Sequence, residues 1–256
     1  MPSGGRNDQA IGNQIVQTDA NTLVDVFDYI NNDNAGGNTG GGRKGYKVAV
    51  LRSTDAGDTW SHAQVVANFV PGTVHDPTTG QLVRSGDIIP EVAVDPRTNS
   101  NTVYLVWQAA SASSPSSVYF SRSTDAGQSW SAPVVINTHT GTEAFTPAVR
   151  VDSKGDITVT YYDFRDDAGP DSNGNNPLTT DYWSIISRDG GQTWDESQIG
   201  GSFDMRGAAY AYGLFVGDYE GLGAGENTDV FHAVFGQATG SPGAEASDIE
   251  GSDATD

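Results

Sequence analysis

The segment Gly217–Leu222 carries three neighbouring side chains that could take part in proton transfer or nucleophilic attack: Asp218, Tyr219 and Glu220. A tyrosine phenol has an ordinary pKa of about 10, so it attacks an electrophile only if a nearby base removes its proton. Asp218 and Glu220 are adjacent bases, but neighbours along a strand point to opposite faces. A carboxylate from another strand, such as Glu91 or Glu143, has the better geometry. The alternative is a packed tyrosine beside a turn aspartate.

Three arginines in the predicted long connections could bind an anion: Arg84, Arg165 and Arg206. The planar guanidinium group matches a carboxylate through two parallel hydrogen bonds. Arg165 follows Asp163 in the sequence Asp163-Phe-Arg165-Asp, where we expect a strand to end, so both are candidates for substrate contact. The competing interpretation is an ion pair within one sheet.

The stretch from Asp163 to Asp181 is rich in Asp and Asn, and Asp171-Ser-Asn173-Gly-Asn175 is similar to part of a calcium-binding loop. It lacks the glycine at the sixth position and the glutamate at the twelfth. We therefore weigh a calcium site here against a solvated loop. The four histidines show no metal-ligand spacing, so we predict no transition-metal site.

Three eight-residue boxes of the form S-x-D-x-G-x-[ST]-W repeat along the chain: Ser53–Trp60, Ser123–Trp130 and Ser187–Trp194. The glycines supply the positive φ of a hairpin turn: Gly57, Gly127 and Gly191. The aspartates can accept backbone N–H groups across that turn: Asp55, Asp125 and Asp189. The closing tryptophans can pack against a neighbouring sheet: Trp60, Trp130 and Trp194. Because the same set recurs in each box, we predict a structural role for it.

Alternating β-branched and aromatic residues flank every box, whereas no amphipathic helix is evident. This pattern predicts three four-stranded units over about residues 10–70, 85–140 and 145–202. A partial fourth unit, over 208–238, is predicted to begin at Tyr212–Val216 and to pair with Val230–Phe235. Together these units form one domain over residues 10–238. Residues 239–256 are small and acidic, so we expect a disordered tail.

The triple box resembles the Asp-box (bacterial neuraminidase, BNR) repeat of the sialidase-like β-propellers. That resemblance implies an all-β propeller of six four-stranded antiparallel blades, of which this chain holds about three and a half. Six blades need roughly 400 residues at the observed box spacing, so we expect a C-terminal portion that forms an open arc. It further implies an exo-alpha-sialidase type of glycosidase that acts on extracellular glycans.

The same resemblance assigns roles to individual residues. Tyr219-Glu-Gly-Leu222 is similar to the context of the sialidase nucleophile, and Arg84, Arg165 and Arg206 are candidates for the arginine clamp on the sialic acid carboxylate. The Phe/Tyr-Arg-x-Pro motif that supplies the first clamp arginine is absent from this sequence. Two alternatives therefore stay open: a secreted or cell-surface propeller that binds glycan or protein without catalysis, and a polysaccharide lyase on the same scaffold.

The amino-acid composition excludes several classes of binding partner. The 33 acidic and 13 basic residues give a net charge of −20, which argues against nucleic acids and anionic membranes as partners, whereas a glycan partner is what the resemblance implies. No apolar run is long enough for membrane insertion. The absence of cysteine excludes disulfides and thiol chemistry. We expect an acidic, halophilic protein that is extracellular or at the cell surface, although this chain shows no signal peptide.

Overall fold

The computed structural model describes residues 8–31, 45–111, 114–225, 230–240 and 247–254. Three antiparallel four-stranded sheets follow one another along the chain, each in simple sequential order. Blade A contains β1 (Gln9–Gln17), β2 (Leu23–Asn31), β3 (Gly45–Ser53) and β4 (Gln64–Phe69). Blade B contains β7 (Glu91–Val94), β8 (Val103–Ser111), β9 (Ser114–Ser123) and β10 (Val134–Val135). Blade C contains β11 (Ala144–Val151), β12 (Ile157–Asp163), β13 (Thr179–Ser187) and β14 (Asp195–Asp204).

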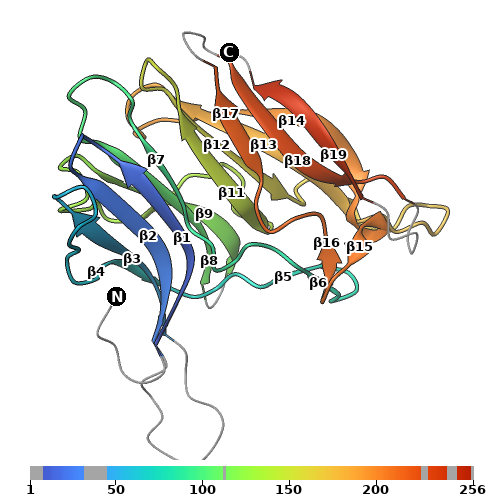
Figure 1. Cartoon of the computed structure of the whole chain (residues 1–256). Coiled ribbons are helices and arrows are strands. Elements are labelled where there is room, and N and C mark those ends of the chain that lie inside the picture. Colours follow the sequence, from blue (N-terminus) through green and yellow to red (C-terminus); the bar gives the residue numbers. More distant parts are fainter. Residues whose placement is uncertain (1–7, 32–44, 112–113, 226–229, 241–246, 255–256) are drawn as a thin grey trace, which may run out of the picture.

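The first strand of each blade is the innermost one. β1 contacts β7, β7 contacts β11, and β11 contacts a later strand, β17 (Gly221–Ala224), so the blades fan out around one axis (Figure 1). Antiparallel meanders of this kind around an axis are the architecture of a β-propeller. The predicted all-β propeller fold is thereby confirmed, as a partial propeller.

The last part of the chain differs from the prediction. Blade D consists of β17, β18 (Phe231–Ala238) and β19 (Ser247–Ala254). β19 lies within the segment that we expected to be a disordered tail, and it pairs with β18 along its whole length. The reason is that the free edge of β18 offers backbone donors and acceptors, which need no apolar alternation in the pairing strand.

The predicted pairing of Tyr212–Val216 with Val230–Phe235 is also wrong. β18 pairs with β17 on that side, whereas Tyr212–Val216 contains β16 (Leu214–Phe215). β16 belongs to a small sheet with β15 (Ala209–Tyr210), β6 (Leu82–Val83) and β5 (Val74–His75), and its pairing with β6 is parallel. A short 3-10 helix, Met205–Gly207, leads into this sheet. The small sheet thus joins the linker that precedes blade B to the linker that follows blade C.

The core lies between the blades. Valines of blade A pack against Leu105 and Trp107 of blade B. Blades B and C enclose a second cluster, and Tyr162 and Tyr182 of blade C pack against Phe235 of blade D in a third. Strands β8 and β12 are buried along nearly their whole length, because side chains alternate between two faces and both faces of the sheet are covered.

The boxes build the junctions between blades. Each box connects the third strand of its blade to the fourth. The Arg52 guanidinium of blade A donates to the Ala126 carbonyl in the box of blade B at 2.8 Å, and Arg122 of blade B donates to the Gly190 carbonyl in the box of blade C at 2.6 Å. Trp194 meets Phe120 of blade B edge-on, with 5.3 Å between ring centroids.

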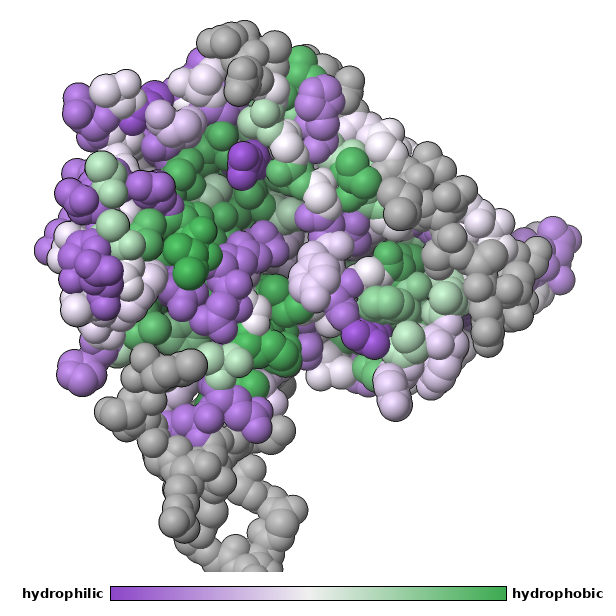
Figure 2. Space-filling model, in the orientation of Figure 1, coloured by the Kyte–Doolittle hydropathy of each residue, from purple (hydrophilic) through white to green (hydrophobic). Residues whose placement is uncertain are grey.

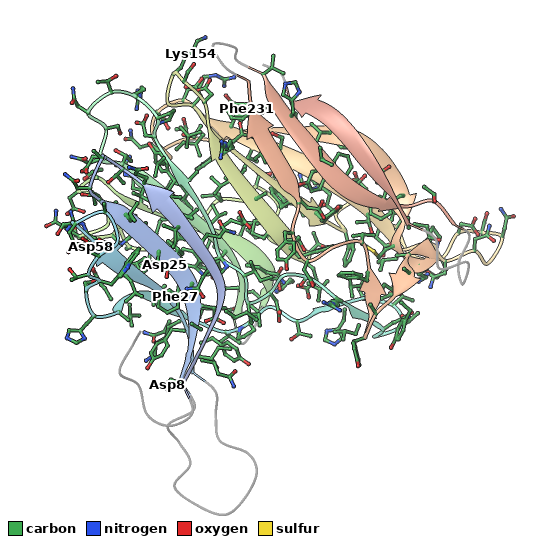
Figure 3. The ribbon with its side chains drawn as sticks, viewed as in Figure 1. Asp8, Asp25, Phe27, Asp58, Lys154 and Phe231 are labelled. Atoms are coloured by element: carbon green, nitrogen blue, oxygen red, sulfur yellow. The ribbon has the colours of Figure 1, made fainter. Side chains whose placement is uncertain are left out.

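The face of blade A that points away from blade B has a small hydrophobic cluster of its own. There Trp60 packs with Phe27 and Leu51 of its own blade, and Ile15 is 60% exposed. Figure 3 shows Asp25 and Phe27 projecting from β2 on this side, and Figure 2 shows a hydrophobic patch over the same blade with hydrophilic residues around it.

Candidate functional site

Ionisable side chains gather at the end of the blades opposite the boxes. Two linkers meet there, because β6 and β16 pair in parallel and the Arg84 N–H donates to the Leu214 carbonyl at 2.9 Å. We call this place the mouth and define it by five residues: Asp28, Arg84, Asp87, Asp218 and Glu220.

Arg84 and Asp218 form the centre of the mouth. Arg84 Nε lies 3.0 Å from Asp218 Oδ1 and Nη2 lies 2.5 Å from Oδ2, a bidentate ion pair. The guanidinium carbon also lies 4.4 Å from the centroid of the Phe215 ring. Because the Arg84 side chain remains 38% exposed, the pair is accessible to a ligand.

A carboxyl group that titrates unusually lies beside this pair. Burial, and then the charge of Asp218, raises the pKa of Asp87 to about 6. Asp87, Arg84 and Tyr212 line a cavity of about 280 Å³ together with residues of β5 and β6. The cavity therefore places the Arg84 guanidinium beside a carboxyl that keeps its proton more readily than usual.

Two further carboxyls at the mouth are withdrawn from solvent, Asp28 completely and Glu220 in part. Asp28 is fully buried, and burial raises its pKa to about 7, with Asp87 adding to the effect. Its Oδ1 accepts the Lys47 N–H at 3.2 Å, while Oδ2 has no hydrogen-bond partner among the described residues. Burial also raises the pKa of Glu220 to about 8, and the Tyr162 hydroxyl lies 2.9 Å from its Oε1.

Tyr219, the predicted nucleophile, lies two residues before β17 and its side chain is 65% exposed. The tyrosine that contacts Glu220 is Tyr162, which is fully buried in the core between blades C and D. The two carboxylates expected to activate it have other partners: Glu91 on β7 accepts from Gln14 Nε2 at 2.6 Å, and Glu143, just before β11, accepts the Ser116 N–H at 2.6 Å.

Arg165 and Asp163 do not reach the mouth. Arg165 Nε lies 2.6 Å from Asp163 Oδ2, and Nη1 lies 2.6 Å from Glu196 Oε2 on β14. The guanidinium carbon stacks 3.7 Å from the Trp183 ring centroid, and the Arg165 side chain is only 10% exposed. The intrablade ion pair is thus the arrangement observed, because Glu196 and Asp163 both need a cation when buried.

Arg206 is held by a different acid. Its Nη2 lies 2.6 Å from Asp76 Oδ2, and the two side chains are 11% and 0% exposed. Arg84, Arg165 and Arg206 therefore each bind their own carboxylate, and the structure does not bring them together as a clamp. Sequence reasoning missed Asp76, Glu196 and Tyr162 as partners. Only Asp76 carried a local signal, since its carboxylate accepts the Thr78 and Thr79 N–H groups of a turn.

The box aspartates stabilise their own turns. Asp55 Oδ1 accepts the Thr59 N–H at 2.9 Å, and Ser53 Oγ accepts the Gly57 N–H at 2.9 Å. The bonds to Thr59 lower the pKa of Asp55 to about 2. The boxes of blades B and C repeat these contacts at 2.8–2.9 Å.

The stretch considered for calcium contains a self-contained turn. Asp171 Oδ1 accepts the backbone N–H groups of Asn173 and Asn175 at 2.8 and 2.9 Å. Among the described residues, no three His, Asp or Glu side chains gather as metal ligands. Calcium binding stays a prediction.

Comparison with known proteins supports the fold. A BNR/Asp-box repeat model matches residues 185–196, and no curated protein matches the chain. Among solved structures, a Hadza microbial sialidase aligns with a TM-score of 0.53 and 15% identity over 94% of this chain and 44% of its own. The GH93 alpha-L-arabinofuranosidase of Fusarium graminearum gives 0.51 and 14% over 98% and 64%. The NanB sialidase from Streptococcus pneumoniae gives 0.51 and 10% over 95% and 51%.

These findings confirm a sialidase-like β-propeller fold with an Asp-box repeat. The chain spans about half to two thirds of the length of these structures, from 44 to 64%. Within the described ranges, no helix is long and apolar enough to cross a membrane.

Proposed function

We propose that this chain is part of a glycan-active propeller that binds a saccharide at the mouth and hydrolyses its glycosidic bond there. The observation that carries the proposal is the cavity lined by the Asp87 carboxyl and by Arg84, whose guanidinium is paired with Asp218. The fold is shared with proteins described as sialidases and as an arabinofuranosidase, which is consistent with a glycan as the ligand.

The two carboxyls differ in the way that glycoside hydrolysis requires. Partial burial raises the pKa of Asp87 to about 6, whereas Asp218 forms a bidentate ion pair with Arg84. Asp87 would donate its proton to the leaving oxygen as the bond from that oxygen to the anomeric carbon breaks. Asp218 would assist the attack of water on that carbon, and the proton released by water restores the acid.

The charges at the mouth favour a neutral sugar over a sialic acid. Arg84 is already neutralised by Asp218, and Arg165 and Arg206 are buried with their own acids. A sugar carboxylate would have to displace Asp218 or approach Asp87 and Asp28, which repel it when ionised. We therefore infer a neutral saccharide as substrate, in place of the sialoside expected from the resemblance.

The test separates binding from turnover. The full chain is incubated with 4-nitrophenyl α-L-arabinofuranoside, arabinobiose and 3′-sialyllactose at 0.1 and 1 M NaCl, and product formation and calorimetric binding are measured separately. We expect neutral sugars to be hydrolysed and kcat/KM to fall above pH 6. Asp87→Asn should abolish turnover, whereas Asp195→Asn, at a side chain that is 87% exposed, should not.

Binding without turnover would overturn hydrolysis and leave the non-catalytic alternative. Preferential binding of sialyllactose at 0.1 M NaCl would overturn the neutral-substrate inference. Salt at 1 M shortens the screening length to about 3 Å, so any discrimination against the anionic sugar should shrink there.

A further inference from the structure

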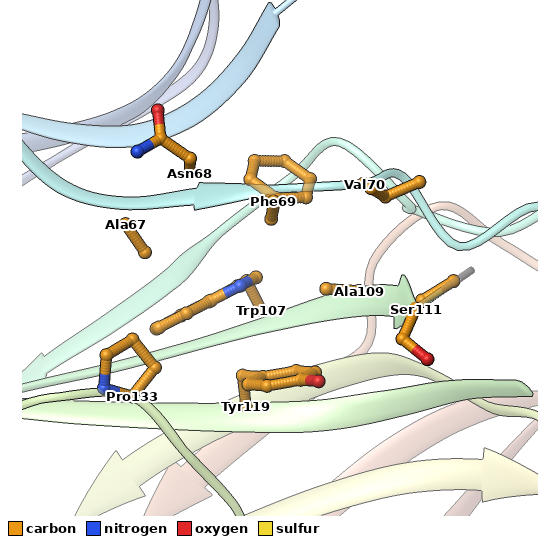
Figure 4. A pocket seen from close by; sticks show the side chains of 10 residues that line it. Ala67, Asn68, Phe69, Val70, Trp107, Ala109, Ser111, Tyr119 and Pro133 are labelled. Carbon is orange, nitrogen blue, oxygen red and sulfur yellow. The ribbon is translucent and has the colours of Figure 1, made fainter. Parts of the chain in front are cut away.

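A groove of about 420 Å³ lies between β4 of blade A and strands β8 and β9 of blade B. It is separate from the cavity of the mouth and shares no lining residue with it. Figure 4 shows its walls, which are formed largely by Phe69, Val70, Trp107, Tyr119 and Pro133. This volume lies in the usual range for small-molecule sites, roughly 300–1,000 Å³.

We propose that this groove is a second saccharide-binding site, which takes a neutral sugar ring stacked on its aromatic wall. The choice of a sugar as occupant rests on the proposed function, whereas the shape and chemistry of the groove stand independently of it.

Trp107 and Tyr119 are stacked on each other in the aromatic wall, and its accessible surface is that of Tyr119, because Trp107 is 2% exposed. The rings of Trp107 and Tyr119 lie nearly parallel, with 20° between their planes and 5.9 Å between their centroids, and Figure 4 shows them one above the other. The C–H face of a sugar ring is apolar and slightly positive, so it packs favourably on the negative face of an aromatic ring. Phe69 from β4 borders the groove on the opposite side.

The polar groups of the groove also fit a neutral sugar. None of the described residues that line it is charged, which argues against an ionic ligand. Trp107 is 2% exposed and its Nε1–H has no hydrogen-bond partner among the described residues. An unpaired buried donor is unfavourable, and a ligand oxygen that reached this N–H would satisfy it. Asn68 contributes an amide at the rim.

The groove is connected to the mouth through a single stretch of chain. Val70 lines the groove and pairs with Ala110, and the chain from there continues through β5 and β6 to Arg84 and Asp87. Gln108 fixes this stretch, because its Nε2 donates to the Gly72 carbonyl and to Ser85 Oγ. A glycan held in the groove therefore lies against the same linker that builds the mouth.

The test uses the five tryptophan indole N–H signals of the full chain in a ¹H–¹⁵N NMR titration with arabinobiose and xylobiose. We expect the Trp107 signal, assigned through Trp107→Phe, to move and to saturate. Tyr119→Ala and Phe69→Ala should each weaken that binding about tenfold or more. Val134→Ala, at an exposed residue of β10 outside the groove, should leave it unchanged.

Three results would overturn the proposal. The Trp107 signal could fail to move on addition of sugar. It could move in Tyr119→Ala and Phe69→Ala as much as it does in the unaltered chain. It could also change with protein concentration alone, which would indicate a second copy as the occupant. Asp87→Asn distinguishes the two sites, because it should abolish turnover at the mouth without moving the Trp107 titration. Failure of hydrolysis alone would thus leave the groove result standing.

Discussion

The hydroxyl of Tyr162 lies 2.9 Å from Oε1 of Glu220 and 2.8 Å from the carbonyl oxygen of Gly236. A tyrosine hydroxyl carries one proton, so it cannot donate fully to both oxygens. A protonated Glu220 resolves this, since it can donate to the hydroxyl while the hydroxyl donates to Gly236. The raised pKa of Glu220, about 8 because of burial, is consistent with that state at neutral pH.

The first prediction concerns stability against pH. Glu220 has a pKa of about 8 when folded and an ordinary value of 4.5, so between these values only the folded state holds the proton. The free energy of unfolding should therefore fall as the pH rises from about 4.5 to 8, by at most about 1.4 kcal/mol per pH unit from this group. Glu220→Gln should flatten the fall, measured by urea denaturation between pH 5 and 9.

Glu91 has a pKa raised to about 7, so it also lowers the free energy of unfolding as the pH rises. Part of the pH dependence should therefore persist in Glu220→Gln. Asp195→Asn serves as the matched control, because that side chain is 87% exposed. An unchanged slope in Glu220→Gln would contradict the assignment.

The second prediction concerns the choice of sugar. Asp218→Asn removes the anion that neutralises Arg84, so it should raise the affinity for 3′-sialyllactose relative to arabinobiose, measured by calorimetry at 0.1 M NaCl. Because both side chains are partly exposed, the loss of stability should be about 1 kcal/mol or less. Adding Arg84→Gln to Asp218→Asn should remove the gain; a gain that survives it would show that another group binds the sialic acid.

The third prediction compares the three box glycines, whose φ values are +97°, +83° and +89° at Gly57, Gly127 and Gly191. Alanine at each should cost about 1–2 kcal/mol for the left-handed conformation. A Cβ at Gly191 would lie 2.6 Å from Phe120 of blade B, at Gly127 3.0 Å from Val24 of blade A, and at Gly57 3.4 Å from Leu23 of its own blade.

The loss of unfolding free energy should therefore rank Gly191→Ala above Gly127→Ala above Gly57→Ala, with roughly 1–3 kcal/mol between the extremes from overpacking. Thermal and urea denaturation measure it. Equal losses would mean that the junctions between blades tolerate the extra methyl group.

The fourth prediction separates structural from ligand-binding arginines. Arg165→Met leaves Asp163 and Glu196 buried without their cation, so it should destabilise the fold by about 3–5 kcal/mol. At a temperature where the variant is folded, its affinity for arabinobiose should equal that of the unaltered chain. Arg84→Gln should do the reverse, with a small change in stability and a clear change in affinity. If Arg165→Met lost binding while its stability stayed unchanged, Arg165 would be a ligand-binding residue and not a structural one.

The blades could be predicted from the sequence because their signals are local. A period of two residues specifies a strand, because its side chains alternate between two faces. A glycine at positive φ specifies the turn, so the boxes at Asp55, Asp125 and Asp189 indicate the same turn three times. β19 could not be predicted in this way, since it forms along the free edge of β18 by backbone pairing, and its own sequence has little apolar alternation.

The sequence by itself thus determined the strands, the boxes, the propeller fold and the excess of acid, and it nominated Arg84, Arg165 and Arg206 as cations for one site. Only the tertiary structure decided which acid each of them binds. Arg84 and Asp218 are 134 residues apart, and Arg206 and Asp76 are 130 apart, so no local pattern relates them. They meet because β6 pairs in parallel with β16, and ion pairs form wherever the folded backbone brings opposite charges within reach.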